Sequence, residues 1–167
     1  HVKRRRQRQM CIRDRWLALY ESKSGERGIF NRQSAINQAA KNGRRDTNHE
    51  FGCNPCSEII LRPYQFCNLT EVVVRETDTE ESLIRKVKLA TILGTFQSTL
   101  TEFKYLRKIW KDNTEEERLL GVSLTGIMDN ALTSGKSPRI GKNIEGLLTR
   151  LRDVAVKTNK DVASKLG

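Results

Sequence analysis

A β-branched run followed by a long helical stripe is the feature that most limits the folds open to this chain. Residues 69–74 include three consecutive valines, which is typical of a strand. From residue 83 to residue 106, apolar side chains recur at steps of three and four, as they do on one face of an amphipathic helix. Small and apolar residues then alternate over residues 119–127 and predict a second, buried strand or a strand-to-helix turn near a ligand. This strand–helix–strand order favours an α/β fold.

The ends of several elements are also predicted by local signals. Asp78 or Thr79 is expected to cap the long helix, because two glutamates follow in its first turn. The apolar stripe predicts that this helix continues to about Trp110. The remaining expectations are a short helix over residues 34–40, a short acidic turn capped by Asn113 or Thr114, and a final helix over residues 143–166.

The first fifteen residues differ in composition from the rest of the chain. They carry seven Lys and Arg residues against Asp14 alone, and they show no apolar periodicity. They are expected to form a disordered basic tail, with residues 16–167 forming the folded part. The string at residues 8–15 also resembles translated sequencing-adapter DNA, and on that interpretation the tail is an artefact and Cys11 has no meaning.

Composition narrows the class of protein. The chain is 37% hydrophobic and 31% charged, which indicates a globular protein with a modest core. The net charge is +11, but outside the tail the chain is only mildly basic, and a phosphate-bearing small molecule explains that as well as nucleic acid does. No apolar stretch is long enough to span a membrane and no secretory signal is visible. A cytoplasmic location is therefore expected, in which the cysteines are free thiols, metal ligands or redox-active groups instead of a disulfide framework.

Three of the four cysteines lie close together, within residues 52–69. If the backbone is extended there, Asn54, Cys56 and Glu58 project to the same side, because successive side chains of an extended chain alternate in direction. Pro55 lacks an N–H and so suits a loop or a sheet edge. We expect a thiol, an amide and a carboxylate to be presented together on a loop tip.

Residue types alone leave several interpretations of these cysteines open. Cys53 and Cys56 have the Cys-x-x-Cys spacing of half a zinc site or of a redox pair. A zinc site would need further ligands from Cys67, Cys11 or His49, and no second Cys-x-x-Cys occurs in the sequence. The cysteines could also be inert and buried, or include a catalytic thiol. A small zinc- or nucleic-acid-binding module that uses these cysteines and the basic arm is thus the alternative function.

The order Asn-Pro-Cys-x-Glu at residues 54–58 resembles the active-site loop of ribonucleotide reductases. A further cysteine, Cys67, follows eleven residues after Cys56, and this spacing is similar to that of the monomeric, adenosylcobalamin-dependent class. The similarity continues on both sides of the loop, through residues 22–32 and residues 86–129.

Two positions depart from the pattern of that family. Cys53 stands where a residue other than cysteine is common, and Ser57 stands where glycine is frequent. The resemblance therefore leaves Cys53 without a role.

The resemblance implies roles for four residues. Cys56 would carry a thiyl radical that removes the 3′ hydrogen of a ribonucleoside triphosphate. Glu58 would act as general base on the 3′ hydroxyl, and Asn54 would hydrogen-bond the sugar. Cys67 would be one of the two thiols that reduce the intermediate and end as a disulfide, with its partner outside this chain.

The same resemblance implies the surroundings of the site. The fold would be part of a ten-stranded α/β barrel that encloses the loop, and the cofactor would be adenosylcobalamin, for which no binding residue is assigned. No metal ion bound directly by these side chains is expected. The partners would be the nucleotide substrate and a thioredoxin-like reductant, and the full-length enzyme would be a monomer. The isolated chain is expected to be inactive.

Overall fold

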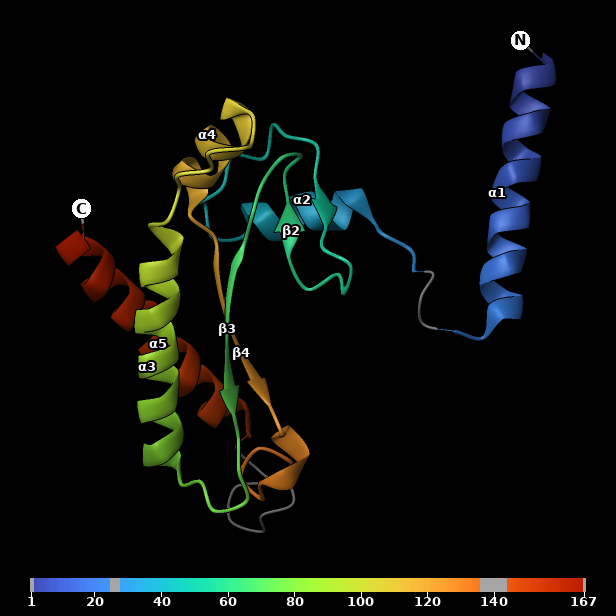
Figure 1. Ribbon diagram of the computed structural model, residues 1–167. Helices are drawn as coiled ribbons and strands as arrows, with labels where there is room; N and C mark the ends of the chain where they lie inside the picture. The colour runs from blue at the N-terminus through green and yellow to red at the C-terminus, as the bar shows by residue number, and fades with distance from the viewer. Residues whose placement is uncertain (1, 25–27, 136–143, 167) are drawn as a thin grey trace. The chain divides into compact units, whose positions relative to one another are not determined.

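The computed structural model describes residues 2–24, 28–135 and 144–166, with side chains described from Cys11 onward. The chain divides into two compact units, His1–Thr47 and Asn48–Gly167. In chain order the elements are α1 (Val2–Ser22), α2 (Arg32–Ala40), β1 (Gly52–Cys53), β2 (Ile60–Leu61), β3 (Asn68–Val73), α3 (Glu80–Ser98), α4 (Lys108–Glu117), β4 (Leu120–Thr125), a 3₁₀ turn η1 (Ile127–Asp129) and α5 (Ile144–Leu166) (Figure 1).

The first unit contains α1 and α2. Helix α1 covers the residues for which the sequence predicted a disordered tail, so the structure differs from that expectation. Arg, Lys and Gln have straight side chains that lose little rotamer freedom in a helix, which favours helix even without an apolar face. Consistent with the missing apolar face, the side chains of residues 11–17 are all exposed. Helix α2 agrees with its prediction and starts after Asn31, whose Oδ1 accepts a hydrogen bond from Ser34 N at 3.0 Å.

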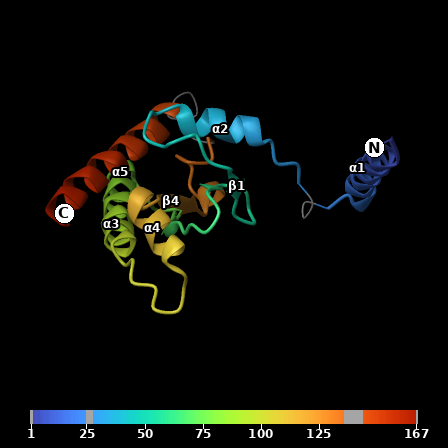
Figure 2. The ribbon, with the colours of Figure 1, turned by 90° about the horizontal axis from the view of Figure 1, so that it is seen from above.

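The second unit is built mainly from two parallel strands, β3 and β4, and two long helices, α3 and α5. Strands β3 and β4 pair in parallel, from Asn68 opposite Leu120 to Val73 opposite Thr125. Parallel neighbours need a crossover connection, which runs through α3 and α4. Helix α5 packs beside α3 (Figure 2). The structure therefore confirms the mixed α/β fold class. The described residues form two two-stranded sheets, so the ten-stranded barrel stays a prediction.

The core of this unit lies between β3, α3 and α5. Alternate residues of β3 differ in exposure, and Val72 is buried on the helix side while Leu69 and Val73 are exposed on the other. Burial of each large apolar side chain contributes about 1.5–3 kcal/mol. The buried cluster consists of Val72, Val74, Leu83, Val87, Ala90, Leu147 and Leu151.

The prediction of one helix reaching Trp110 is wrong. Helix α3 does begin after Thr79, whose side chain accepts a hydrogen bond from Ser82 N at 3.3 Å in a capping box. It ends at Ser98, however. The Ser98 and Thr99 hydroxyls donate back to helix carbonyls, each at 2.7 Å, and such local bonds compete with continuation of a helix.

The acidic turn predicted near residue 115 is also wrong, because Asn113 and Thr114 lie inside α4. This helix ends at Glu117, and the capping residue Arg118 has a left-handed φ of 41°. The two predicted strands are confirmed within one or two residues as β3 and β4, although no residue of β4 is fully buried as the sequence predicted. The last predicted helix is confirmed as α5, and its expected first residue, Asn143, lies outside the described residues.

None of the helices in the described part of the chain combines the length and the apolar character that crossing a lipid bilayer requires.

Candidate functional site

The Asn-Pro-Cys-x-Glu stretch forms the tip of a two-stranded hairpin. Strands β1 and β2 pair antiparallel, and the chain reverses between them. Ser57 N donates to Asn54 O at 2.9 Å, which closes a β-turn. Pro55 takes the second position of this turn, where its fixed φ fits. The loop tip expected at Pro55 is therefore present as a β-turn, and the side chains of Asn54 and Glu58 meet through this turn instead of through strand alternation.

Asn54 organises the tip. Its Oδ1 accepts a hydrogen bond from Ile59 N at 3.0 Å, and its Nδ2 donates to Glu58 Oε1. Its backbone N also donates to Ile59 O at 3.3 Å. One amide side chain thus holds the returning backbone and the carboxylate at once. The structure brings together Asn54 and Glu58, two of the four residues singled out from the sequence.

Cys56 occupies the third position of the turn and is exposed. The next residue, Ser57, has a φ of 64°, in the left-handed region that glycine adopts with little strain. Position four of such turns favours glycine for this reason. Glycine would therefore adopt this backbone conformation with less strain than Ser57 does.

Cys67 lies immediately before β3 and is half-buried. Burial raises the pKa of its thiol, and the negative charge of Glu58 raises the pKa further. A hydrogen bond with the backbone of Cys67 itself has a smaller, opposite effect. Glu58 therefore accepts a hydrogen bond from Asn54, and its negative charge disfavours ionisation of the Cys67 thiol.

Cys53, which the sequence left without a role, is the last residue of β1 and directly precedes the turn. Its Sγ is 3.5 Å from Ser57 Oγ, and the residue is half-buried. This contact spans the turn from its first flank to its last residue. Cys53 is thus placed to support the shape of the tip.

The thiols do not form a metal centre in the part of the chain that the structure describes. Cys11, Cys53, Cys56 and Cys67 are all free thiols. No group of three or more His, Cys, Asp or Glu side chains among the described residues is arranged to hold a metal ion. The alternative of a zinc-binding module therefore has no support from these residues.

A buried polar contact near the hairpin was missed by the sequence reasoning. The side chain of Arg62, only 2% exposed, pairs with Glu116 at 2.7 Å and with Glu117 at 3.2 Å. A charged residue directly after the apolar run at residues 59–61 was the available signal. It could not identify the partners, because they follow more than fifty residues later in the chain.

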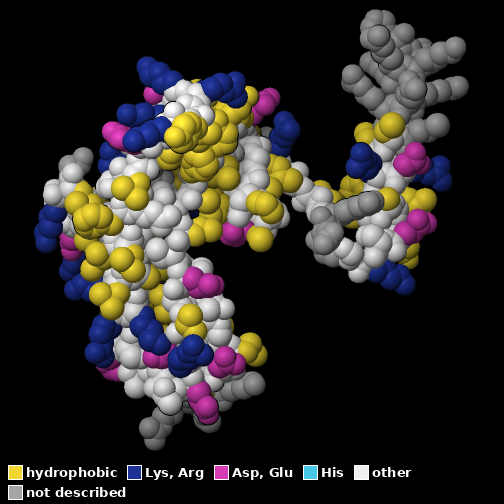
Figure 3. Space-filling model, in the orientation of Figure 1, with side chains coloured by type: hydrophobic (Ala, Val, Ile, Leu, Met, Phe, Trp, Pro, Cys, Tyr) yellow, Lys and Arg dark blue, Asp and Glu magenta, His cyan; other side chains and the backbone are white. Residues whose placement is uncertain are grey.

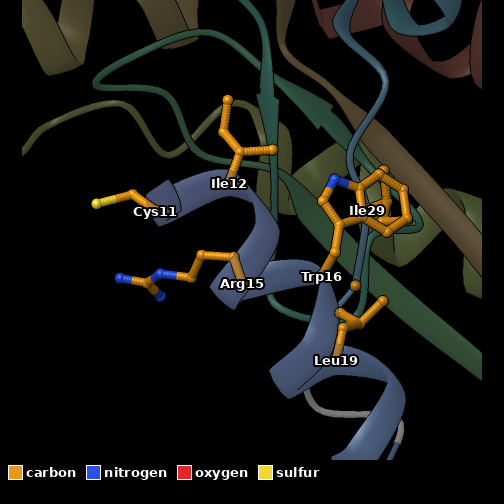
Figure 4. Close-up of a pocket in the computed structure, with 7 residues that line it drawn as sticks. Cys11, Ile12, Arg15, Trp16, Leu19 and Ile29 are labelled. Carbon is orange, nitrogen blue, oxygen red and sulfur yellow. The ribbon is translucent and has the colours of Figure 1, made fainter. Parts of the chain in front are cut away.

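A separate pocket of about 400 Å³ lies in the first unit, between α1 and the residues that follow it. Figure 4 shows Trp16 and Ile29 on one side of this pocket, while Cys11 and Arg15 point the other way. None of the four predicted site residues lines it.

A curated relative matches most of the chain. The chain is 34% identical over 118 residues to the adenosylcobalamin-dependent ribonucleoside-triphosphate reductase of Lacticaseibacillus paracasei. The match covers 68% of this chain but 15% of the relative, so the chain spans a small part of that protein's length. No family model matches the chain, and no solved structure matches it. Over most of its length, this chain is therefore similar to one part of a ribonucleoside-triphosphate reductase.

Proposed function

We propose that this chain is the active-site segment of a larger, adenosylcobalamin-dependent ribonucleotide reductase that acts on ribonucleoside triphosphates. One observation carries the proposal. Glu58 is held by Asn54, and its charge raises the pKa of the Cys67 thiol, on a hairpin whose exposed corner is Cys56. The similarity to a ribonucleoside-triphosphate reductase over 118 residues supports the same assignment.

The surroundings of each side chain suit a step of that reaction. Cys56 is exposed at the turn, so a thiyl radical on its sulfur could reach the 3′ hydrogen of a bound ribonucleotide. Glu58, fixed by Asn54, would accept the proton of the 3′ hydroxyl. The 2′ hydroxyl would then take a proton from one of the two reducing thiols and leave as water, and at the end of the reaction the Cys56 thiol would return the abstracted hydrogen to the 3′ carbon.

Cys67 would supply reducing equivalents in this scheme. Its raised pKa keeps the sulfur as a protonated thiol at neutral pH, which is the form that can give up hydrogen. Together with a second thiol outside this chain, it would deliver two electrons and two protons and become a disulfide. A thioredoxin-like reductant would restore the two thiols.

Adenosylcobalamin, when bound, supplies a radical by homolysis of its cobalt–carbon bond. The exposed thiol of Cys56 fits a residue that is reached from outside the hairpin. No described residue is assigned to hold the cofactor, and this chain's own contribution is the ordered tip.

Substitution of the two cysteines in the full-length protein tests the proposal. Cys56→Ser should lower reduction roughly 10³-fold or more, including a single turnover by prereduced protein, because the hydrogen-abstracting sulfur is gone. Cys67→Ser should still release tritium from the 3′ position of labelled substrate but should form no deoxynucleotide.

Cys53→Ser is the matched control, because it removes a neighbouring thiol to which the scheme gives no chemistry. It should keep most of the activity. Turnover by Cys56→Ser at the unsubstituted rate would contradict the proposal.

A further inference from the structure

Helix α4 packs against the segment that joins the hairpin to Cys67. This connection, residues 62–66, leaves β2 and leads directly into Cys67. Figure 1 shows α4 at the end of the second unit where β3 and β4 begin. The position of the hairpin tip relative to Cys67 therefore depends on how this short connection is held.

Polar contacts hold the connection to α4. Arg62 pairs with Glu116 and Glu117, and the side chain of Glu117 is itself only 6% exposed. Gln65 Nε2 donates to Glu117 Oε2 and, at 3.3 Å, to Asn113 O. Gln65 Oε1 accepts a hydrogen bond from Arg62 N at 2.9 Å, which closes the connection on itself. We call Arg62, Gln65, Glu116 and Glu117 the α4 clamp.

Aromatic contacts support the same junction. The rings of Tyr64 and Trp110 meet edge to face, with centroids 5.7 Å apart. Phe66 lies 4.7 Å from Trp110 and 5.0 Å from Phe103, measured between ring centroids. The guanidinium of Arg107 lies 4.7 Å above the Tyr64 ring. Figure 3 shows hydrophobic side chains at the surface beside α4.

The α4 clamp is built at an energetic cost. Removing a guanidinium and a carboxylate from water is unfavourable unless their geometry is good, and apolar residues of similar size often stabilise as well or better. Within the described residues, the buried Nε of Arg62 has no hydrogen-bond partner. Tyr64 adds backbone strain, with a φ of 58°. Stability alone is therefore a weak reason for the α4 clamp. The clamp is better suited to holding residues 62–66 in one position.

We propose that Arg62 is a positioning residue, which fixes the connection to α4 and so sets where the hairpin tip that carries Glu58 lies relative to Cys67. The reason is geometric. Glu58 and Cys67 flank the clamped connection, so their separation follows from its conformation. What this placement serves rests on the proposed function, but the placement itself does not. Testing the placement needs no turnover, so its failure is distinct from failure of the reductase assignment.

The test measures how strongly Glu58 influences Cys67. The protein used is the 167-residue chain with Cys11, Cys53 and Cys56 replaced by serine. The pH dependence of its alkylation by iodoacetamide gives the pKa of the Cys67 thiol. Glu58→Gln should lower this pKa, because it removes a nearby negative charge. A shift of one unit would raise the alkylation rate about tenfold at a pH below the pKa.

Releasing the α4 clamp should abolish this influence. In the double variant Arg62→Met with Glu117→Gln, no buried charge is left unpaired, and Glu58→Gln should no longer change the alkylation rate. Arg62→Lys keeps the positive charge but loses the planar fork, so it should keep part of the effect. Glu116→Gln changes a largely exposed partner of Arg62 and should also weaken the effect of Glu58→Gln. If the double variant does not fold, the result for Glu116→Gln decides the test.

A matched control lies on the same helix. Lys111 forms an exposed pair with Glu115 at 3.7 Å, so Lys111→Met should leave the Glu58 effect at full size. Hydrogen-exchange protection of amides in α3 and β3 should be unchanged in every variant used. The proposal is overturned if Glu58→Gln changes the Cys67 rate equally with the clamp intact and with the clamp released.

Discussion

At the scale of single residues, Asn54 does most to shape the site. The sequence suggested that its amide binds the sugar of a substrate. In the structure this amide bonds to Glu58 and to the backbone of Ile59. An amide nitrogen has two hydrogens, so a bond to Glu58 is compatible with a further bond to a ligand. The sugar-binding role stays a prediction, and the support of Glu58 is an additional role.

The left-handed backbone at Ser57 leads to a stability prediction. Ser57→Gly should raise the free energy of unfolding by about 0.5–1 kcal/mol, because relief of the strained φ outweighs the greater freedom of glycine in the unfolded chain. Urea denaturation measures the change. Ser57→Ala is the control, since it removes the hydroxyl near Cys53 but keeps the strain. A similar gain from alanine would mean that the backbone is not the cause.

At the scale of elements, the junction after β4 is tightly constrained. Gly126 has a φ of 70°, and a Cβ at this position would lie 2.5 Å from the backbone oxygen of Val74. The backbone N of Val74 donates to Thr125 O at 2.9 Å. The Val74 backbone, whose oxygen the added Cβ would meet, is therefore already fixed by pairing with β4. Neither strand can move away without loss of the parallel pairing.

Gly126→Ala should therefore lower the free energy of unfolding by about 2–4 kcal/mol, through strain in φ together with the clash. Gly135 is the matched control. Its φ is 73°, but a Cβ added there would meet no atom within 4 Å, so Gly135→Ala should cost only about 1–2 kcal/mol. Thermal or urea unfolding compares the two variants. Equal losses would show that the close approach to Val74 is unimportant.

At the scale of the whole molecule, the acid stability of the second unit depends strongly on Asp78. This carboxylate accepts hydrogen bonds from Lys86 Nζ at 2.5 Å, Ser82 Oγ at 2.7 Å and Arg75 N at 2.8 Å. These contacts lower the pKa of Asp78 to about 2, with the bond from Lys86 as the largest cause. The contacts tie the end of β3 to the first turns of α3.

The direction of the pH effect follows from this lowered pKa. The unfolded-state pKa of aspartate is about 3.9, so the stabilisation is complete above about pH 4 and is lost as the pH falls towards 2. Asp78→Asn should lower the free energy of unfolding at pH 7 and flatten its decline between about pH 4 and pH 2. Urea titrations at several pH values measure this. Asp153→Asn, at an exposed position on α5, is the control and should leave the decline in place.

The sequence predicted local structure well where one residue type or one period dominates. Strand β3, the start of α3 after Thr79 and the helix α5 follow from β-branched runs, a capping residue and apolar periodicity. The end of α3 was missed, because apolar residues continue at helical spacing past Ser98 although the helix itself ends there. The loop tip at Pro55 was expected, but side-chain alternation does not describe it, because Pro55 and Ser57 reverse the chain in a turn.

The sequence by itself determined the α/β class and the chemical groups of the candidate site, because both depend on residue types and spacing along a short stretch. Only the tertiary structure decided that Arg62 is held by Glu116 and Glu117 and that the charge of Glu58 raises the pKa of the Cys67 thiol. These relations join segments that are separated in the chain, so they exist only once β2, β3 and α4 have packed together. Local sequence preferences cannot predict such contacts, because the side chains become buried against one another only when the unit has folded.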